Sequence, residues 1–262
     1  MRMTPQVKVA VITGAAQGIG KSTAKLLASR GYCLILNDIE SCAPTLDCLG
    51  GAAQNALEAL GDISQEATAR EIARIAQQRF GRTDVLVNNA GIAHISPAEE
   101  TTEADWRRVM DVNLLGPFLL SREIGGMMLR QQQGSIINVA SIAGLLGVAD
   151  RAAYNSSKHG LIGLTRTLAA EWGGRGVRCN AVCPGWVKTP MDAGPQSAGL
   201  YTDQDITGRV PMGRFASPDD IASAIAFLAD PAQSGFINGH TLSVDGGWFA
   251  DASWESLRLR HR

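Results

Sequence analysis

The stretch VKVAVITGAAQGIG, residues 7–20, decides the fold class of this chain. Its first half is apolar and β-branched, which predicts a buried strand over Val7–Ile12 that ends at Thr13 and Gly14. Its second half is rich in glycine and leads directly into a helical pattern over Gly18–Arg30. A strand, a glycine turn and a helix therefore follow one another without a linker.

The same alternation continues along the chain. We expect further strands at 33–36, 84–87, 135–139, 177–182 and 241–244, and helices at 66–80, 102–130, 151–172 and 218–228. Between 41 and 61 the pattern is weak and predicts only a broken helix and a short strand at 57–60. Strands that are apolar throughout, separated by amphipathic helices, are typical of a doubly wound parallel α/β sheet of Rossmann type, with helices on both faces.

The 262 residues show no change of composition and no linker that would separate two domains. At roughly 100–200 residues per domain, we expect one domain over residues 1–262. A long segment rich in glycine, proline and polar residues, at about 187–214, is expected to cover the substrate, although a solvated loop would look the same. The residues after Gly247 form a C-terminal tail, 248–262.

Composition excludes several classes of function. The net charge is −1, and no block of like charges precedes the tail, so nothing favours nucleic acid or an anionic membrane. No apolar run reaches the ~18 residues of a membrane span. The first residues lack the apolar core of a signal peptide, which leads us to expect a cytoplasmic protein. Five cysteines without a CxxC pair suggest unpaired thiols, and we expect no metal site.

The glycine turn is a candidate phosphate site. Glycines allow a tight turn and a close approach of the backbone to a pyrophosphate, which then faces a helix N-terminus. Asp38 ends the second predicted strand, 24 residues after Gly14, where a carboxylate can bond the adenosine ribose. A carboxylate there repels a 2′-phosphate, and neither 15–17 nor 39–41 contains Arg or Lys. The cofactor predicted from these residues is NAD rather than NADP.

Several further motifs occur in a specific order along the chain: Asp62-Ile63, Asn88-Asn89-Ala90-Gly91, Asn113, Ser141, Tyr154 with Lys158, Pro184-Gly185 with Thr189, and Val244-Asp245-Gly246-Gly247. Together with the glycine turn, they resemble the single-domain short-chain dehydrogenases/reductases from Val7 to Gly247. The glycine spacing carries one residue more than the usual dinucleotide fingerprint, as in that family.

The resemblance implies which residues bind the cofactor. They are Gly14, Gln17, Gly18, Ile19, Gly20, Asp38, Asp62, Ile63, Asn89, Ala90, Gly91, Tyr154, Lys158, Pro184, Gly185, Val187 and Thr189. Asp62 and Ile63 correspond to residues at the adenine, and Val187 and Thr189 to residues at the nicotinamide carboxamide and the phosphates.

Tyr154 and Lys158 lie four positions apart at the start of a predicted helix, so both side chains share one face. A free phenol titrates near pH ~10, and a neighbouring ammonium lowers that value toward neutral pH. By resemblance, Tyr154 transfers the proton, Lys158 tunes Tyr154 and binds the nicotinamide ribose, Ser141 orients the substrate, and Asn113 supports a proton relay through water. The implied reaction transfers a hydride between nicotinamide and a secondary alcohol or ketone.

The substrate is less defined. Polar residues in the covering segment, together with His94 after the fourth strand, favour a small hydroxylated compound such as a sugar or polyol. A 3-oxoacyl thioester and a cyclic or linear ketone stay open, and so does a dinucleotide-binding regulatory protein without turnover. Because related proteins are commonly tetramers built through their long helices, we expect a homotetramer with the tail near a neighbour.

Overall fold

The computed structural model describes residues 7–188 and 202–253. In them, seven parallel strands form one sheet in the order β3-β2-β1-β4-β5-β6-β7. The strands are β1 (Lys8–Thr13), β2 (Tyr32–Asp38), β3 (Ala56–Leu60), β4 (Val85–Asn88), β5 (Gly134–Val139), β6 (Val177–Pro184) and β7 (Thr241–Val244). The predicted fold class is confirmed.

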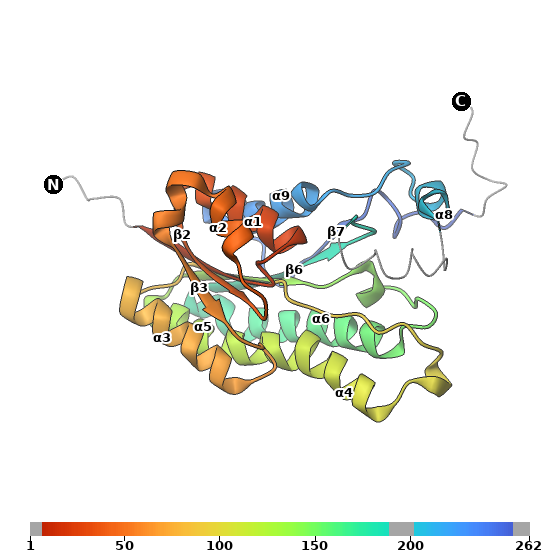
Figure 1. Ribbon diagram of the computed structural model, residues 1–262, viewed down its shortest axis with the longest axis horizontal. Helices are drawn as coiled ribbons and strands as arrows, with labels where there is room; N and C mark the ends of the chain where they lie inside the picture. The colour runs from red at the N-terminus through yellow and green to blue at the C-terminus, as the bar shows by residue number, and fades with distance from the viewer. Residues whose placement is uncertain (1–6, 189–201, 254–262) are drawn as a thin grey trace.

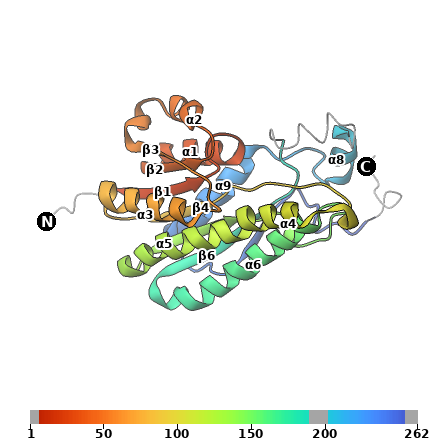
Figure 2. The same ribbon diagram turned by 60° about the horizontal axis from the view of Figure 1, so that its bottom comes forward.

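Helices cover both faces of this sheet. On the upper face of Figure 1 lie α1 (Gly18–Ser29), α2 (Ala43–Cys48) and α9 (Pro218–Ala229). On the lower face, which comes forward in Figure 2, lie α3 (Glu66–Phe80), α4 (Glu103–Met110), α5 (Gly116–Gln131) and α6 (Ala152–Trp172). Two short helices, α8 (Asp203–Arg209) and α10 (Pro231–Ser234), also lie in the described part of the chain. None of these helices combines the length and the apolar character that a membrane crossing needs.

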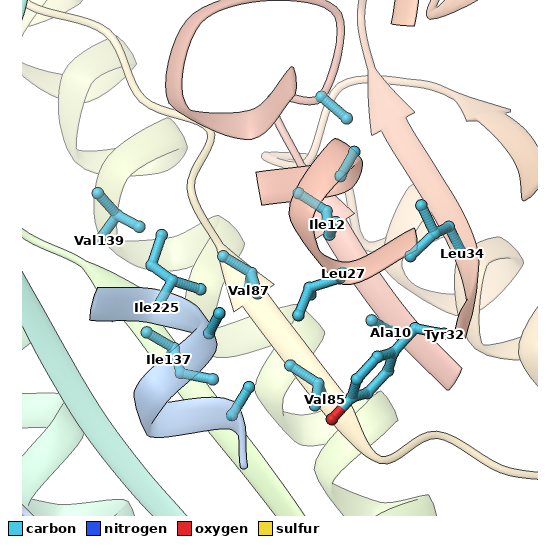
Figure 3. Packing of buried hydrophobic residues seen from close by; sticks show 14 of the residues in the cluster. Ala10, Ile12, Leu27, Tyr32, Leu34, Val85, Val87, Ile137, Val139 and Ile225 are labelled. Carbon is cyan, nitrogen blue, oxygen red and sulfur yellow. The ribbon is translucent and has the colours of Figure 1, made fainter. Parts of the chain in front are cut away.

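The core has two halves because successive residues of a strand point to opposite faces. Ala10 and Ile12 of β1 pack with Leu27 of α1 and Ile225 of α9, as Figure 3 shows. Val11 points the other way and packs in the cluster formed with α3, α5 and α6. This double burial is the reason that the strands are apolar throughout.

The sheet order places a crevice at the centre of the molecule. The chain winds outward from β1 through β2 to β3, then returns to place β4 on the other side of β1. The loops after β1 and β4 therefore diverge at the carboxyl edge of the sheet. Ligands of open α/β sheets bind at such a switch point.

The long helix predicted at 102–130 is interrupted. A π-helical segment, Asp111–Leu115, separates α4 from α5. The apolar pattern does not reveal this change, because it depends on the register of the backbone hydrogen bonds.

The segment at about 187–214, whose composition indicates a loop, contains α8. A capping box starts this helix: Thr202 accepts a hydrogen bond from the Asp205 backbone and Asp205 accepts one from the Thr202 backbone. Seven residues are too few to display a helical period of apolar side chains.

Candidate active site

The glycine turn after β1 brings two stretches of backbone into contact. Gly14 has a left-handed φ of +64°, and a Cβ there would lie 2.8 Å from the Asn89 side chain. A Cβ on Gly20 would lie 2.0 Å from the carbonyl oxygen of Gly14. Glycine at these two positions lets α1 start directly against the turn. Gln17 precedes α1 without a side-chain cap, so the first N–H groups of the helix stay available to an anion.

Asn89, which follows β4, holds the turn in place. Its Nδ2 donates to the carbonyl oxygens of Thr13 and Gly14, at 2.9 and 3.0 Å. In return, the Thr13 hydroxyl oxygen accepts hydrogen bonds from the backbone N–H groups of Asn89 and Ala90, both at 3.0 Å. These bonds tie the carboxyl ends of β1 and β4 together at the switch point.

Asp38 closes the turn from the side of β2. One of its carboxylate oxygens accepts from the N–H of Ala16 at 2.9 Å, and the other accepts from the N–H of Ile39 at 2.8 Å. Glu40 lines the cavity beside it. Two carboxylates, those of Asp38 and Glu40, therefore lie near the glycine turn on the side of β2.

A cavity of about 690 Å³ runs along the carboxyl edge of the sheet from β2 to β6. Its volume lies in the range of about 300–1,000 Å³ that is common for ligand sites. Sixteen of the residues singled out in the sequence line it: Gly14, Gln17, Gly18, Ile19, Asp38, Asp62, Ile63, Asn89, Ala90, Gly91, Ser141, Tyr154, Lys158, Pro184, Gly185 and Val187. The long cavity, the glycine positions that a Cβ would fill and the open start of α1 together fit an extended nicotinamide dinucleotide.

Asp62 faces this cavity as part of a polar cluster. Burial alone would raise the pKa of Asp62, but hydrogen bonds from Ser64 and Arg108 outweigh it and hold that pKa below its usual value. Arg108 Nη1 donates to the carboxylate at 2.8 Å. The carboxylate therefore stays charged at neutral pH, next to the buried side chain of Ile63.

Ser141, Tyr154 and Lys158 all line the cavity, and Lys158 lies at the carboxyl end of β5. Ser141 follows that strand, and its Oγ accepts from the N–H of Ala143 at 3.1 Å, which leaves the hydroxyl proton for a ligand. Lys158 is buried on α6, and its Nζ donates to the carbonyl oxygen of Val139 at 2.8 Å and lies 5.6 Å from the centre of the Tyr154 ring. Burial lowers the pKa of Lys158 to about 8.

Asn113 lies behind this group, in the π segment. Its Nδ2 donates to the carbonyl oxygen of Ile92 at 2.9 Å and to the hydroxyl of Ser157 at 3.1 Å, and its Oδ1 accepts from the N–H of Ile92. A Cβ on Gly91 would lie 3.2 Å from Asn113 Oδ1 and 3.4 Å from Lys158 Nζ. The missing side chain at Gly91 thus keeps space open beside both groups.

Some expected site residues do not reach the cavity. Asn113 and Gly20 support its walls without lining it. The His94 ring faces Asp105, with 3.9 Å between Nε2 and the carboxylate, while its neighbours Ala93 and Ile95 line the cavity. Thr189 lies outside the described residues.

Only part of the polar segment expected to cover the substrate, about 187–214, lies within the described residues. Thr202 caps α8, and the Asp203 carboxylate pairs with Lys188, so neither lines the cavity. Asp192, Gln196 and Tyr201 lie outside the described residues.

Among the cavity residues that the sequence does not single out are four large side chains. Arg108 comes from α4, Arg151 precedes α6, Trp186 follows β6, and Trp248 begins the tail. The rings of Trp186 and Trp248 lie 6.1 Å apart, so the start of the tail packs on its own chain. A tryptophan directly after the Pro184-Gly185 motif was a visible signal, whereas the two arginines have no spacing that singles them out.

Comparisons with known proteins agree on one family. The family model described as Enoyl-(Acyl carrier protein) reductase matches residues 14–249. Cis-4-hydroxycyclohexanecarboxylate dehydrogenase from Sinomonas cyclohexanicum is 41% identical over 93% of this chain and 97% of its own length. D-threitol dehydrogenase from Mycolicibacterium smegmatis is 39% identical over 92% of each chain. An uncharacterized short-chain type dehydrogenase/reductase from Sinorhizobium fredii is 42% identical over 93% of this chain but 44% of its own length.

A solved structure supports the same grouping. A protein assigned as an NAD(P)-dependent gluconate 5-dehydrogenase from Beutenbergia cavernae matches with a TM-score of 0.87 at 38% identity, and it holds NADP at low occupancy. The match covers 95% of this chain and 99% of that one.

Proposed function

We propose that this chain, which belongs to the short-chain dehydrogenase/reductase family, interconverts a secondary alcohol and its ketone with NAD as preferred cofactor and Tyr154 as general acid and base. One observation carries the proposal: Ser141, Tyr154 and Lys158 line the same cavity as the glycine turn. A hydroxyl group bound between Ser141 and Tyr154 is then next to the space for a dinucleotide.

The proposed reaction removes a proton and a hydride from the alcohol and leaves the ketone. The oxygen of Tyr154 takes the hydroxyl proton while the Ser141 hydroxyl donates a hydrogen bond to the substrate oxygen. Bound nicotinamide supplies the acceptor for the hydride, which leaves the carbinol carbon with its two electrons. The C–H and O–H bonds break, and the carbon–oxygen bond becomes the carbonyl of the ketone.

The other residues of the group act on Tyr154. The Lys158 ammonium, 5.6 Å from the centre of the ring, favours the phenolate that receives the proton. Lys158 would also bind the nicotinamide ribose. Asn113 holds the backbone at Ile92 and the Ser157 hydroxyl, and in this proposal it supports a relay of protons through water from Lys158.

The preference for NAD rests on charge at the adenosine end. Asp38 and Glu40 line that end of the cavity, and two carboxylates repel the additional phosphate of NADP. The Asp38 carboxylate also keeps its place through the N–H of Ala16. Because the Beutenbergia cavernae protein holds NADP, the two cofactors need direct comparison.

For the substrate, a small hydroxylated compound such as a polyol or sugar is favoured by the likeness to D-threitol dehydrogenase. The likeness to cis-4-hydroxycyclohexanecarboxylate dehydrogenase favours a cyclic alcohol or ketone as a second candidate. The description of the matching family model keeps an acyl thioester as a third.

The test is a panel of polyols, cyclic alcohols and 3-oxoacyl thioesters, followed by NADH or NADPH absorbance. We expect kcat/KM to be at least tenfold higher with NAD than with NADP on the best substrate. Tyr154→Phe should lower kcat about 10²–10⁴-fold, since it removes the proton acceptor, while the Kd for NAD changes little. Tyr32→Phe is the matched control, because Tyr32 is buried in the core (Figure 3) and does not line the cavity. Near-normal turnover by Tyr154→Phe, or NAD binding without turnover of any compound, would contradict the proposal.

A further inference from the structure

Arg151 occupies a fixed position at the substrate end of the cavity. It is the residue before α6, three positions from Tyr154, and both residues line the cavity. Its carbonyl oxygen accepts from the N–H of Asn155 at 2.8 Å, and it forms an isolated parallel bridge with Ser96. The side chain therefore starts from a backbone held by the first turn of α6 and by the segment that contains Ser96.

The guanidinium of Arg151 has few partners in the described part of the chain. Its Nη1 donates to the carbonyl oxygen of Ala149 at 3.1 Å, and its central carbon lies 5.8 Å from the centre of the Trp186 ring. Within residues 7–188 and 202–253, no carboxylate lies within 4.0 Å of it. A guanidinium carries five N–H donors, so Arg151 retains donors for a ligand.

Neighbouring cations differ from Arg151 in this respect. Arg108, also on the cavity wall, pairs with the Asp62 carboxylate at 2.8 Å. Arg209 lies over the Trp248 ring and pairs with Asp251 at 3.4 Å. Lys158 is buried, and its Nζ donates to the carbonyl oxygen of Val139. Among the described cations near Tyr154, Arg151 thus combines an open position on the cavity wall with the absence of an acidic partner.

The rest of the wall around Arg151 is apolar. Ile95, Val148, Trp186 and Trp248 line this end of the cavity. Walls of this kind suit a short carbon skeleton, and the guanidinium suits an anionic group on it. A carboxylate matches a guanidinium in shape, since two parallel N–H···O bonds can form.

We propose that Arg151 is a specificity-determining residue that binds a carboxylate of the substrate, so that the substrate class is small hydroxy acids and the corresponding oxo acids. The inference rests on the proposed function and names the substrate of the same site. The hydroxyl lies between Ser141 and Tyr154 while the carboxylate pairs with Arg151. Arg151 lies three positions before Tyr154 and both residues line the cavity, so one small molecule can reach both groups.

Turnover provides the first arm of the test. The probes are 3-hydroxybutanoate, 4-hydroxypentanoate and 4-hydroxycyclohexanecarboxylate, each compared with its primary carboxamide, which keeps the shape and removes the charge. The wild type should prefer the acid of its best pair by roughly 10- to 100-fold in kcat/KM, as expected for a charge-assisted hydrogen bond. Arg151→Gln should bring that ratio close to one, mainly through KM. Arg70→Gln is the matched control, because Arg70 is exposed on α3 and pairs with Glu66.

Binding provides the second arm, which does not depend on turnover. Calorimetry on the NAD-loaded protein compares cyclohexanecarboxylate with cyclohexanecarboxamide, neither of which carries a hydroxyl to oxidise. A tighter Kd for the carboxylate in the wild type, lost in Arg151→Gln and kept in Arg70→Gln, supports the carboxylate site. If this carboxylate preference is found but no alcohol is turned over, the proposed function fails and the carboxylate site at Arg151 is still supported. Absence of the preference in the wild type, or its survival in Arg151→Gln, overturns the inference while Tyr154-dependent turnover is unaffected.

Discussion

Lys158 is a cation in an environment that disfavours charge. Its side chain is buried on α6, and the carbonyl oxygen of Val139 is the hydrogen-bond acceptor found for its Nζ. Burial lowers the pKa of this amine to about 8, from the 10.5 of a free lysine side chain. The folded protein thus gives up stability to keep an ammonium beside Tyr154, which is common for groups that serve a reaction rather than the fold.

This cost predicts a pH dependence of stability. Because the folded pKa lies below the unfolded one, the folded state binds fewer protons between pH 8 and 10.5, and the free energy of unfolding rises with pH across that window. Lys158→Met removes the titrating group and leaves the others in place. Relative to that variant, the wild type should gain about 2 kcal/mol from pH 7 to pH 10. Urea denaturation of the cofactor-free proteins measures the difference, and a constant difference between the two pH values would contradict the assignment.

Residues that follow a strand could be placed from sequence, and others could not. Asp38 ends β2, and Asn89 and Ser141 follow β4 and β5. Parallel strands bring their carboxyl ends to one edge of the sheet, so the proximity of these residues follows from the fold class. Arg151 and Trp186 meet only because the chain segments after β5 and β6 run toward each other. No spacing in the sequence determines that path.

Among the elements, α1 depends on the closest approach of backbone in the site. A Cβ on Gly20 would meet the carbonyl oxygen of Gly14 at 2.0 Å and the Asn89 side chain at 2.8 Å. A helix that begins here must therefore carry glycine at its third position. The turn, the helix start and the end of β4 form one unit.

Gly20→Ala is expected to push the start of α1 away from the glycine turn and from the end of β4. Overpacking of this kind costs about 1–3 kcal/mol of stability, and the shift should also raise the Kd for NAD about tenfold or more. Gly174→Ala is the control, since a Cβ there meets nothing within 4 Å and its stability should be unchanged or slightly higher. Thermal denaturation and NAD titration measure the two effects. Equal behaviour of the two variants would show that the contact at Gly20 does not constrain the turn.

Helix and strand positions could be predicted where a physical signal marks their ends. The predicted helix 66–80 coincides with α3, because Gly81 takes a left-handed φ of +68° and its N–H bonds the carbonyl oxygens of the last turn. The start of α8 has a clear signal in Thr202 and Asp205, yet it lies in a segment whose composition indicates a loop. In that segment, local capping outweighs composition.

At the scale of the whole molecule, three of the exposed large apolar side chains lie on the helical layer of α4, the π segment and α5. Trp106 of α4, Leu115 of the π segment and Phe118 of α5 are each about 40% exposed. Exposed apolar residues gathered on one layer are typical of an association surface. We propose that this layer pairs between subunits of a homotetramer.

Light scattering tests the assembly. The wild type should elute at four times the mass of one chain, and Phe118→Glu should shift it to smaller species, because a charge would be buried at the interface. Leu60→Glu, at the exposed end of β3, serves as the control and should leave the mass unchanged. A monodisperse monomer of the wild type would contradict the proposed tetramer.

The π segment also has a consequence for how this chain can be aligned with its relatives. One π turn holds one residue more than an α-helical turn, and each residue of an α-helix advances by about 100°. A helical wheel drawn straight through 103–131 therefore assigns the residues after Leu115 to the wrong face. Deleting one residue within 111–115 would restore an uninterrupted α-helix and leave Leu120 and Ile124 facing the sheet, because the wide turn is what accommodates the extra residue. A one-residue gap placed here in an alignment therefore corresponds to the loss of the π turn, and the residues on both sides keep the helix face that packs on the sheet.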